Sequence, residues 1–310
     1  MMIRRSIAFV FQSLFLSTLF VITASPLFGQ IIDHTGIVVP GASIVKLGDG
    51  YSFTEGPIAD RKGNVYFTDQ PNNKILRWDA KKGTFSVFLD KAGRSNGLFF
   101  DNKGNLIACA DENNQLWSIN KKGKHSVLVD QRNGKLLNGP NDVWVHPNGD
   151  IYFTDPLYKR NYWTRDPEPQ QDGEHVYLWK SKEKELVLLE SGVVKPNGII
   201  GTPDGKNLYV ADIGDRKIYR YDIQADGSIS GRRLAAPMGA DGITLDEKGN
   251  LYLAGNGVTV FDPQGNKIAE IPVREGWTAN VTFGGKDRKM LFITAGDAVY
   301  GLNMNVKGAY

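Results

Sequence analysis

Short apolar runs separated by glycine-containing turns recur along this chain with a spacing of roughly 45 residues, which is typical of propeller blades. In the unit from Asn141 to Asp155, two apolar runs flank Asn148-Gly149, a dipeptide suited to a tight hairpin turn. Five further units follow the same plan, and each begins with Glu, Asn or Asp. These first residues, called openers below, are Glu55, Asn96, Asn141, Asn197, Asp241 and Asn280.

The pattern continues beyond each hairpin and predicts the fold. Third strands are expected to begin at Lys74, Gln115, His175, Lys217, Gly257 and Ala298. Fourth strands follow in five units, and the one that contains RRLAA in the fourth unit is weaker than the others. Four antiparallel strands form one blade, so the sequence predicts an all-β, six-bladed β-propeller over residues 30–310. The sixth unit has no fourth strand of its own. We expect Ser43–Leu47 to pair with this last blade and close the ring.

The first 29 residues lie outside the repeat. Arg4 and Arg5 precede an almost wholly apolar run from Ile7 to Ala24, and Pro26 stands in a short exit of small residues. This order predicts a signal peptide over residues 1–29, and hence a secreted or periplasmic protein. An uncleaved membrane anchor is the alternative, because the run is long enough to span a bilayer. After cleavage we expect no stable association with a membrane.

Composition excludes several classes of function. The net charge of +3 includes Arg4 and Arg5, so the mature chain is near neutral and nothing favours nucleic acid. The single cysteine, Cys109, can form no intramolecular disulfide and lies in an apolar run typical of a buried strand. The motifs of serine hydrolases, P-loop NTPases and zincin proteases do not occur. No protein partner is inferred.

The openers are candidates for a metal site, since the innermost strand of every blade lines the central channel. Two carboxylates and four amides would then converge at one end of that channel, where burial without a partner is unfavourable. Such oxygen ligands suit Ca²⁺, Mg²⁺ or Mn²⁺. The alternative is that each opener caps a loop, because Gly follows four of the six and such pairs are common in turns.

Several motifs resemble the gluconolactonase, senescence-marker-protein (regucalcin) and luciferin-regenerating-enzyme family. They are TEGP at 54–57, PND at 140–142, PNGI at 196–199, ADGI at 240–243 and NVTFGG at 280–285. The resemblance implies a six-bladed propeller that hydrolyses a sugar lactone with one divalent cation, Ca²⁺ being the first choice and Mg²⁺, Mn²⁺ or Zn²⁺ the alternatives. It also implies that Glu55, Asn141, Asn197 and Asp241 are the metal ligands, and that Asn96 contacts substrate.

Asp241 is expected to act both as ligand and as general base for the attacking water. A phosphotriester or aryl-ester hydrolase remains an alternative, as does a binding propeller whose metal only holds the ring together.

One segment departs from the repeat. The 19 residues Pro156–Glu174 hold three aromatic residues, three prolines and several charges, and loops of this length are usually functional or disordered. We expect this segment to form a lid. Tyr158 within it and Asp155, which directly precedes the segment, are expected to contact substrate. Lys159, Arg160 and Arg165 could supply hydrogen-bond donors. A disordered surface insertion is the alternative.

Overall fold

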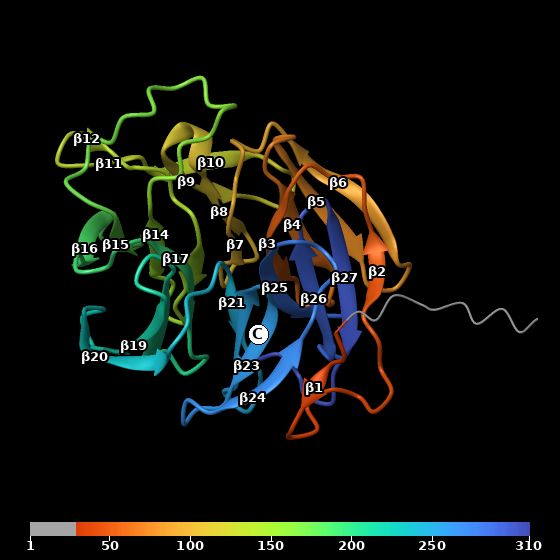
Figure 1. Cartoon of the computed structure of the whole chain (residues 1–310). Helices are drawn as coiled ribbons and strands as arrows, with labels where there is room; N and C mark the ends of the chain where they lie inside the picture. Colours follow the sequence, from red (N-terminus) through yellow and green to blue (C-terminus); the bar gives the residue numbers. More distant parts are fainter. Residues whose placement is uncertain (1–28) are drawn as a thin grey trace, which may run out of the picture.

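A computed structural model describes residues 29–310, and the predicted signal peptide lies outside the described residues except for Gly29. Nearly all regular structure is β, with one short 3-10 helix, η1 (Asp111–Asn113). No helix within the described range is long and apolar enough to cross a membrane. Six antiparallel sheets of four or five strands are arranged around a central axis, as predicted for a six-bladed propeller (Figure 1).

The first three blades follow each other along the chain. Blade one comprises β3 (Thr54–Ala59), β4 (Val65–Asp69), β5 (Lys74–Asp79) and β6 (Thr84–Asp90). Blade two comprises β7 (Leu98–Phe100), β8 (Leu106–Ala110), β9 (Gln115–Ile119) and β10 (His125–Val129). A small ribbon of β11 (Gln131–Arg132) and β12 (Lys135–Leu136) precedes blade three, which comprises β13 (Val143–Val145), β14 (Ile151–Asp155), β15 (His175–Lys180) and β16 (Glu185–Glu190).

The remaining blades complete the ring. Blade four comprises β17 (Pro196–Gly201), β18 (Asn207–Asp212), β19 (Lys217–Ile223) and β20 (Ile229–Ala236). Blade five comprises β21 (Ile243–Leu245), β22 (Leu251–Gly255), β23 (Gly257–Phe261) and β24 (Lys267–Ile271). Blade six comprises β25 (Thr278–Gly284), β26 (Met290–Ala295) and β27 (Ala298–Asn303), and β2 (Val45–Gly48) is its fourth strand. All six third strands begin where the sequence predicted.

The N-terminal segment contributes to two blades. β2 pairs antiparallel with β27, with Lys46 opposite Tyr300, which confirms the predicted closure of the ring. β1 (Ile32–Asp33), which was not predicted, adds a fifth strand to blade five, with Ile32 opposite Glu270 on β24. Both pairings can be followed in Figure 1. The chain before Ser43 is therefore part of the folded ring.

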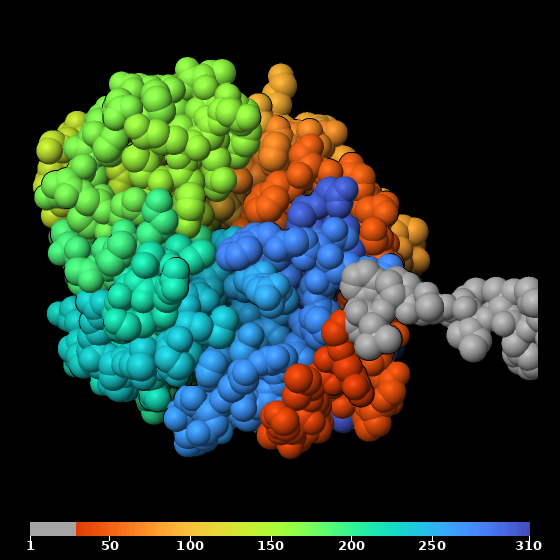
Figure 2. Space-filling model, in the orientation of Figure 1, coloured from red at the N-terminus to blue at the C-terminus, as the bar shows by residue number. Residues whose placement is uncertain are grey.

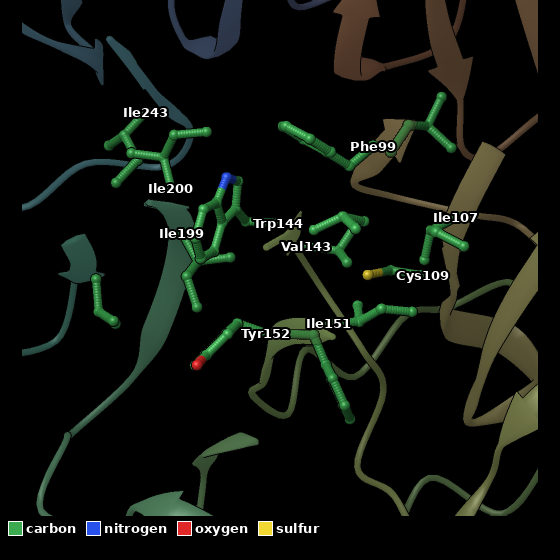
Figure 3. Packing of buried hydrophobic residues seen from close by; sticks show 14 of the residues in the cluster. Phe99, Ile107, Cys109, Val143, Trp144, Ile151, Tyr152, Ile199, Ile200 and Ile243 are labelled. Atoms are coloured by element: carbon green, nitrogen blue, oxygen red, sulfur yellow. The ribbon is translucent and has the colours of Figure 1, made fainter. Parts of the chain in front are cut away.

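Apolar side chains of neighbouring blades interlock between the sheets. Trp144 of β13 is fully buried, and a Cβ atom added to Gly201 of β17 would lie 2.2 Å from its ring. Glycine at position 201 therefore lets the indole of one blade lie against the next. Figure 3 shows Trp144 among residues of four successive blades. Cys109 is buried as expected, and burial raises the pKa of its thiol well above its ordinary value.

The last residues of the chain close one end of the channel. Tyr310 accepts a hydrogen bond from Trp144 Nε1 at 2.9 Å and packs edge-on against Phe99 of β7. Ala309 N donates to the carbonyl of Leu245, at the end of β21. The C-terminus accordingly lies in the middle of the ring (Figure 1). Because the openers stand at the starts of the same inner strands, they lie at the opposite end.

Candidate active site

The inner strands bring the six openers to one end of the channel. Glu55, Asn197 and Asn280 lie within β3, β17 and β25, whereas Asn96, Asn141 and Asp241 each stand two residues before their strand. Five openers are nearly inaccessible, with exposed fractions between 2% and 6%, and Asp241 is half-buried. Access from solvent to this group of residues is therefore by way of Asp241.

The glycines that follow four of the openers allow neighbouring blades to meet there. A Cβ atom on Gly97 would lie 2.3 Å from Asp142 Oδ1, and one on Gly242 would lie 1.9 Å from the carboxamide of Asn280. Gly97 N instead donates to the carbonyl of Asn141 at 2.7 Å. Close approach around the axis therefore accounts for these glycines.

Three carboxylates share this buried space. Burial, together with the charges of Asp241 and Asp142, raises the pKa of Glu55 well above its ordinary value. Burial also raises the pKa of Asp241 to about 6 and that of Asp142 to about 7. In the absence of a counter-charge, ionisation of the group is thus unfavourable. A cation placed among these carboxylates would make their ionisation favourable.

The oxygen atoms available to such a cation belong to the four predicted ligands. Glu55 Oε2 accepts from Gly56 N at 2.8 Å and from Asn280 Nδ2 at 3.2 Å, but Oε1 has no partner in the described structure. The side-chain amide of Asn141 makes no hydrogen bond within residues 29–310, although only 5% of the residue is exposed. Asn197 donates through Nδ2 to Tyr158 at 2.9 Å, which leaves its amide oxygen free.

Such a donor set fits a hard divalent cation. Carboxylate and amide oxygens are the ligands that Ca²⁺, Mg²⁺ and Mn²⁺ prefer. No three His, Cys, Asp or Glu side chains of the described residues gather as a metal group, so two carboxylates with amides are the set on offer. A dipositive ion would offset the charges of Glu55 and Asp241.

The two other openers differ from each other. Asn280 has both ends of its amide engaged, since Oδ1 accepts from Val281 N at 2.8 Å while Nδ2 holds Glu55. It therefore orients a predicted ligand. Asn96 is 3% exposed, and its side-chain amide has no hydrogen-bond partner among the described residues. This free amide is compatible with the predicted role in substrate contact.

Two residues at the site were not singled out from the sequence. Asp142 follows an opener and accepts from Val143 N at 2.9 Å and Ile199 N at 3.2 Å, so it ties blade three to blade four. Trp277, in the loop before β25, donates its indole N–H to Asp241 Oδ2 at 2.5 Å and is 41% exposed. Its indole thus fixes the orientation of the most accessible carboxylate. An aromatic residue next to an opener-bearing strand would have been the only signal.

The segment Pro156–Glu174, called the lid below, reaches the openers. Tyr158 accepts from Asn197 Nδ2, and the charge of Asp241 contributes to raising the pKa of the Tyr158 hydroxyl above its ordinary value, after burial as the main cause. The guanidinium of Arg160 is 5.1 Å from the Tyr158 ring. Tyr158 thus stands beside two predicted ligands, where a substrate contact was expected.

One buried carboxylate of the ring, Asp111, binds two side chains of the lid. Trp163 Nε1 donates to Asp111 Oδ2 at 3.3 Å, and Arg165 lies 3.7 Å from Oδ1. Gln70 of blade one donates to the same Oδ2 at 3.1 Å. Residues near 150–175, in light green, cover the upper left of the face shown in Figure 2. An ordered cover thus replaces the alternative of a disordered insertion.

Asp155 has a different place from the predicted one. It is fully buried, and its two oxygens accept from Asn138 N and Gly139 N, each at 2.9 Å. Asp69 and Asp212 bind loop N–H groups in the same way in blades one and four. With no exposed surface, Asp155 fixes the loop before blade three and is not placed to touch a substrate directly.

Comparisons with known proteins point to one family. The SMP-30/gluconolactonase/LRE-like region family matches residues 53–297. A gluconolactonase from Zymomonas mobilis is 28% identical over 273 residues, which cover 78% of this chain and 76% of the relative. A pentonolactonase from Haloferax volcanii is 24% identical over 77% of this chain and 80% of its own. The structure of a gluconolactonase from Xanthomonas campestris superimposes with a TM-score of 0.80 at 27% identity, covering 89% of this chain and 98% of that one.

Proposed function

Because the chain belongs to the SMP-30/gluconolactonase/LRE-like family, we propose that it is a metal-dependent hydrolase of a sugar lactone or a similar cyclic ester. The proposal is supported by relatives named gluconolactonase and pentonolactonase. It goes beyond them in placing the reaction at the openers of this chain.

The observation that carries the proposal is the set of free oxygens around one axis. Glu55, Asn141 and Asn197 each present an oxygen that accepts no hydrogen bond among the described residues. Asp241, which is half-buried, stands beside them. These four residues would hold one divalent cation, and their all-oxygen character makes Ca²⁺ the first choice. When bound there, the cation would polarise the lactone carbonyl as a Lewis acid.

The residues of the chain would perform the proton chemistry. Asp241 is placed to accept a proton from the water that adds to the lactone carbonyl carbon. Trp277 holds the other oxygen of this carboxylate, so the acceptor is oriented in advance. The bond between the carbonyl carbon and the ring oxygen then breaks, and the proton passes to that ring oxygen. One lactone and one water thus give one hydroxy acid.

Turnover with and without a chelator tests the proposal. Acid release from a panel of aldonolactones, followed at constant pH, should fall to the rate of spontaneous hydrolysis after exhaustive chelation and rise again with Ca²⁺. An Asp241→Asn variant should bind the cation more weakly and release little acid above that rate. A binding propeller would never exceed the spontaneous rate, and a phosphotriester hydrolase would cleave diisopropyl fluorophosphate or paraoxon in preference to the lactones.

We further propose that the protein acts outside the cytoplasm, on the basis of the N-terminal pattern of residues 1–29. Expression of the full chain in a Gram-negative host should give a periplasmic product that begins near Gln30. Intact-mass measurement of that product checks the cleavage site. A cytoplasmic product that retains Arg4 and Arg5 would contradict the proposed export.

A further inference from the structure

Four basic side chains lie in the lid or beside it, and they differ in how closely they are paired. Arg94 Nε lies 3.1 Å from Glu112 Oε2. Arg165 NH2 donates to the carbonyl of Asn138 at 2.6 Å and lies 3.7 Å from Asp111. Lys195 Nζ lies 3.7 Å from Glu174 and donates to a lid carbonyl at 3.4 Å. Each of these three cations therefore has a carboxylate within 3.7 Å, although Arg165 Nε has no hydrogen-bond partner among the described residues.

The side chain of the fourth, Arg160, donates no hydrogen bond within the part of the chain that the structure describes. Its Nε atom is buried without a partner, although a guanidinium has five N–H donors. The nearest carboxylate in an ion pair with it is Asp111, at 3.9 Å. Asp111 is already bound by Gln70 and Trp163 and lies nearer to Arg165. With its ion pair at 3.9 Å and no hydrogen bond from its side chain, Arg160 is thus the most weakly paired of the four cations.

Arg160 also lies next to a side chain that touches an opener. Its guanidinium is 5.1 Å from the ring of Tyr158, and the Tyr158 hydroxyl accepts from Asn197 Nδ2 at 2.9 Å. Asp241 and Glu55 are the two carboxylates assigned to the divalent ion, so neither is left to neutralise Arg160 once the ion is bound. The Tyr158 ring, 5.1 Å from the Arg160 guanidinium, restricts how far this side chain can swing.

We infer that Arg160 is the specificity-determining residue of the lid, and that the site prefers lactones bearing an anionic group remote from the ring ester. This inference rests on the proposed function. A lactone whose carbonyl lies at the openers would extend its far end toward the lid, where Arg160 presents unused donors. Carboxylate, phosphate and sulfate share the required chemistry, because each can accept paired hydrogen bonds from one guanidinium.

The neighbouring Lys159 provides a matched control. Its Nζ lies 2.7 Å from Glu168 Oε1, and the side chains of both residues are at least half exposed. Lys159 thus carries the same charge as Arg160 at the adjacent position but is directed to the outside of the lid. A Lys159→Gln variant changes the net charge equally and leaves the cation beside Tyr158 in place.

The experiment compares wild type, Arg160→Gln, Arg160→Lys and Lys159→Gln. The substrates are D-glucono-1,5-lactone, its 6-phosphate, and the 1,4-lactone of glucaric acid, each corrected for spontaneous hydrolysis. In wild type we expect a higher kcat/KM for the two anionic lactones. Arg160→Gln should lower kcat/KM for these by about tenfold or more, as for loss of a charge-assisted hydrogen bond. The neutral lactone should change less, and Lys159→Gln should match wild type.

The ratio between anionic and neutral substrates is the diagnostic readout. A loosened lid would impair all three lactones together, so an equal loss in Arg160→Gln would overturn the inference. A wild-type preference for the neutral lactone would also overturn it. Arg160→Lys should recover part of the ratio, because it restores charge without the paired donors. Comparison of kcat/KM for the phosphorylated lactone with kcat/KM for the carboxylated lactone shows which anion the site prefers.

Failure of the proposed function would be seen separately. If no lactone is hydrolysed, calorimetric binding of gluconate, 6-phosphogluconate and glucarate to the Ca²⁺-loaded protein still tests Arg160. Two of these acids, 6-phosphogluconate and glucarate, carry a second anionic group. If they bind more tightly than gluconate and lose this advantage in Arg160→Gln, the recognition of anionic groups by Arg160 is supported and only the hydrolysis is refuted. Equal affinity of wild type for all three acids, or an equal loss of affinity for all three in Arg160→Gln, would overturn the inference.

Discussion

Among single residues, Glu55 has the clearest consequence for the metal. Glu55→Gln keeps the side-chain shape but removes one of the two carboxylate charges assigned to the cation. We expect cation affinity and lactone turnover to fall together, each by about tenfold or more, because hydrogen-bonded or ligated charges in buried sites contribute strongly. Isothermal titration with Ca²⁺ and initial rates at saturating Ca²⁺ check this.

Glu190→Gln is the matched control for Glu55→Gln. Glu190 ends β16 on the outer side of blade three, where it accepts from Tyr221. Its replacement should leave metal affinity and turnover near wild type. Full metal content and full activity in Glu55→Gln would mean that the ligand assignment is wrong.

Asp155 predicts a dependence of stability on pH. Burial raises the pKa of Asp155 to about 7, from an ordinary value of 3.8. Between these values the folded state binds the proton that the unfolded state has released. This residue's contribution to the free energy of unfolding is therefore greatest at low pH. It falls by about 1.4 kcal/mol per pH unit as pH rises from about 4 to 7, and it is constant above that range.

Comparison of wild type with Asp155→Asn isolates this effect. The amide cannot ionise, so the Tm of the variant relative to wild type should rise between pH 5 and pH 8. Any lost hydrogen bond to Asn138 or Gly139 adds an offset that does not depend on pH. Thermal unfolding in a series of buffers measures the difference, and a constant difference would show that Asp155 does not titrate as described.

The repeat made the openers predictable, but not the residues around them. Glu55 and Asp241 could be found because equivalent positions in a ring of blades must meet at the axis. Asp142 was missed because its role depends on the backbone of Ile199 in the next blade. Trp277 was missed because it lies in a loop outside the repeating pattern. Contacts between blades are set by the packed ring and leave no local pattern in the chain.

At the scale of elements, the lid is the part whose contacts could not be derived from its sequence. Its composition suggested contacts through aromatic and cationic side chains. In the structure these side chains lie in three different surroundings. Tyr158 and Arg160 face the openers, Trp163 and Arg165 bind Asp111, and Lys159 points outward. A loop without periodicity gives no information on which side chains face inward.

Replacing 158–173 by a short Gly-Ser bridge tests the lid as a unit. All four predicted ligands lie outside this segment, so bound Ca²⁺ should stay near one equivalent. KM across a lactone panel should change several-fold, because Tyr158 and Arg160 are removed from the mouth. Metal analysis and steady-state kinetics provide the measurements. Unchanged kinetics for every lactone would leave the lid without a role in recognition.

The strands themselves were more predictable than the lid, with two exceptions. β1 has only two residues, too few for an alternating pattern, and its pairing with β24 depends on the closed ring. β20 was expected to be a weak strand, but it runs for eight residues. Its Arg-rich sequence is polar because most of it is exposed, as suits the outermost strand of a blade.

Considered as a whole, the molecule is a ring closed by its N-terminal segment, and this segment also fills the core. Ile37 is 1% exposed and packs within blades five and six. Asn305 donates to the carbonyls of Gly36 and Val38 at 3.0 and 3.1 Å. Val45 in the closing strand is 55% exposed. The residues before β2 therefore bury apolar surface, whereas β2 chiefly supplies backbone pairing.

Two truncations separate these contributions. A chain starting at Ala42 lacks β1 and Ile37, and loss of one buried isoleucine removes roughly 1.5–3 kcal/mol of stabilisation. We expect a lower Tm with a single unfolding transition. A chain starting at Tyr51 also lacks β2, which leaves β27 as an unpaired edge. It should melt lower still and associate as concentration rises, because an open edge pairs with other chains. Circular dichroism and light scattering measure both effects. Identical melting of the two truncations would show that β2 does not close the ring, and a wild-type Tm for the first would show that the segment before it is dispensable.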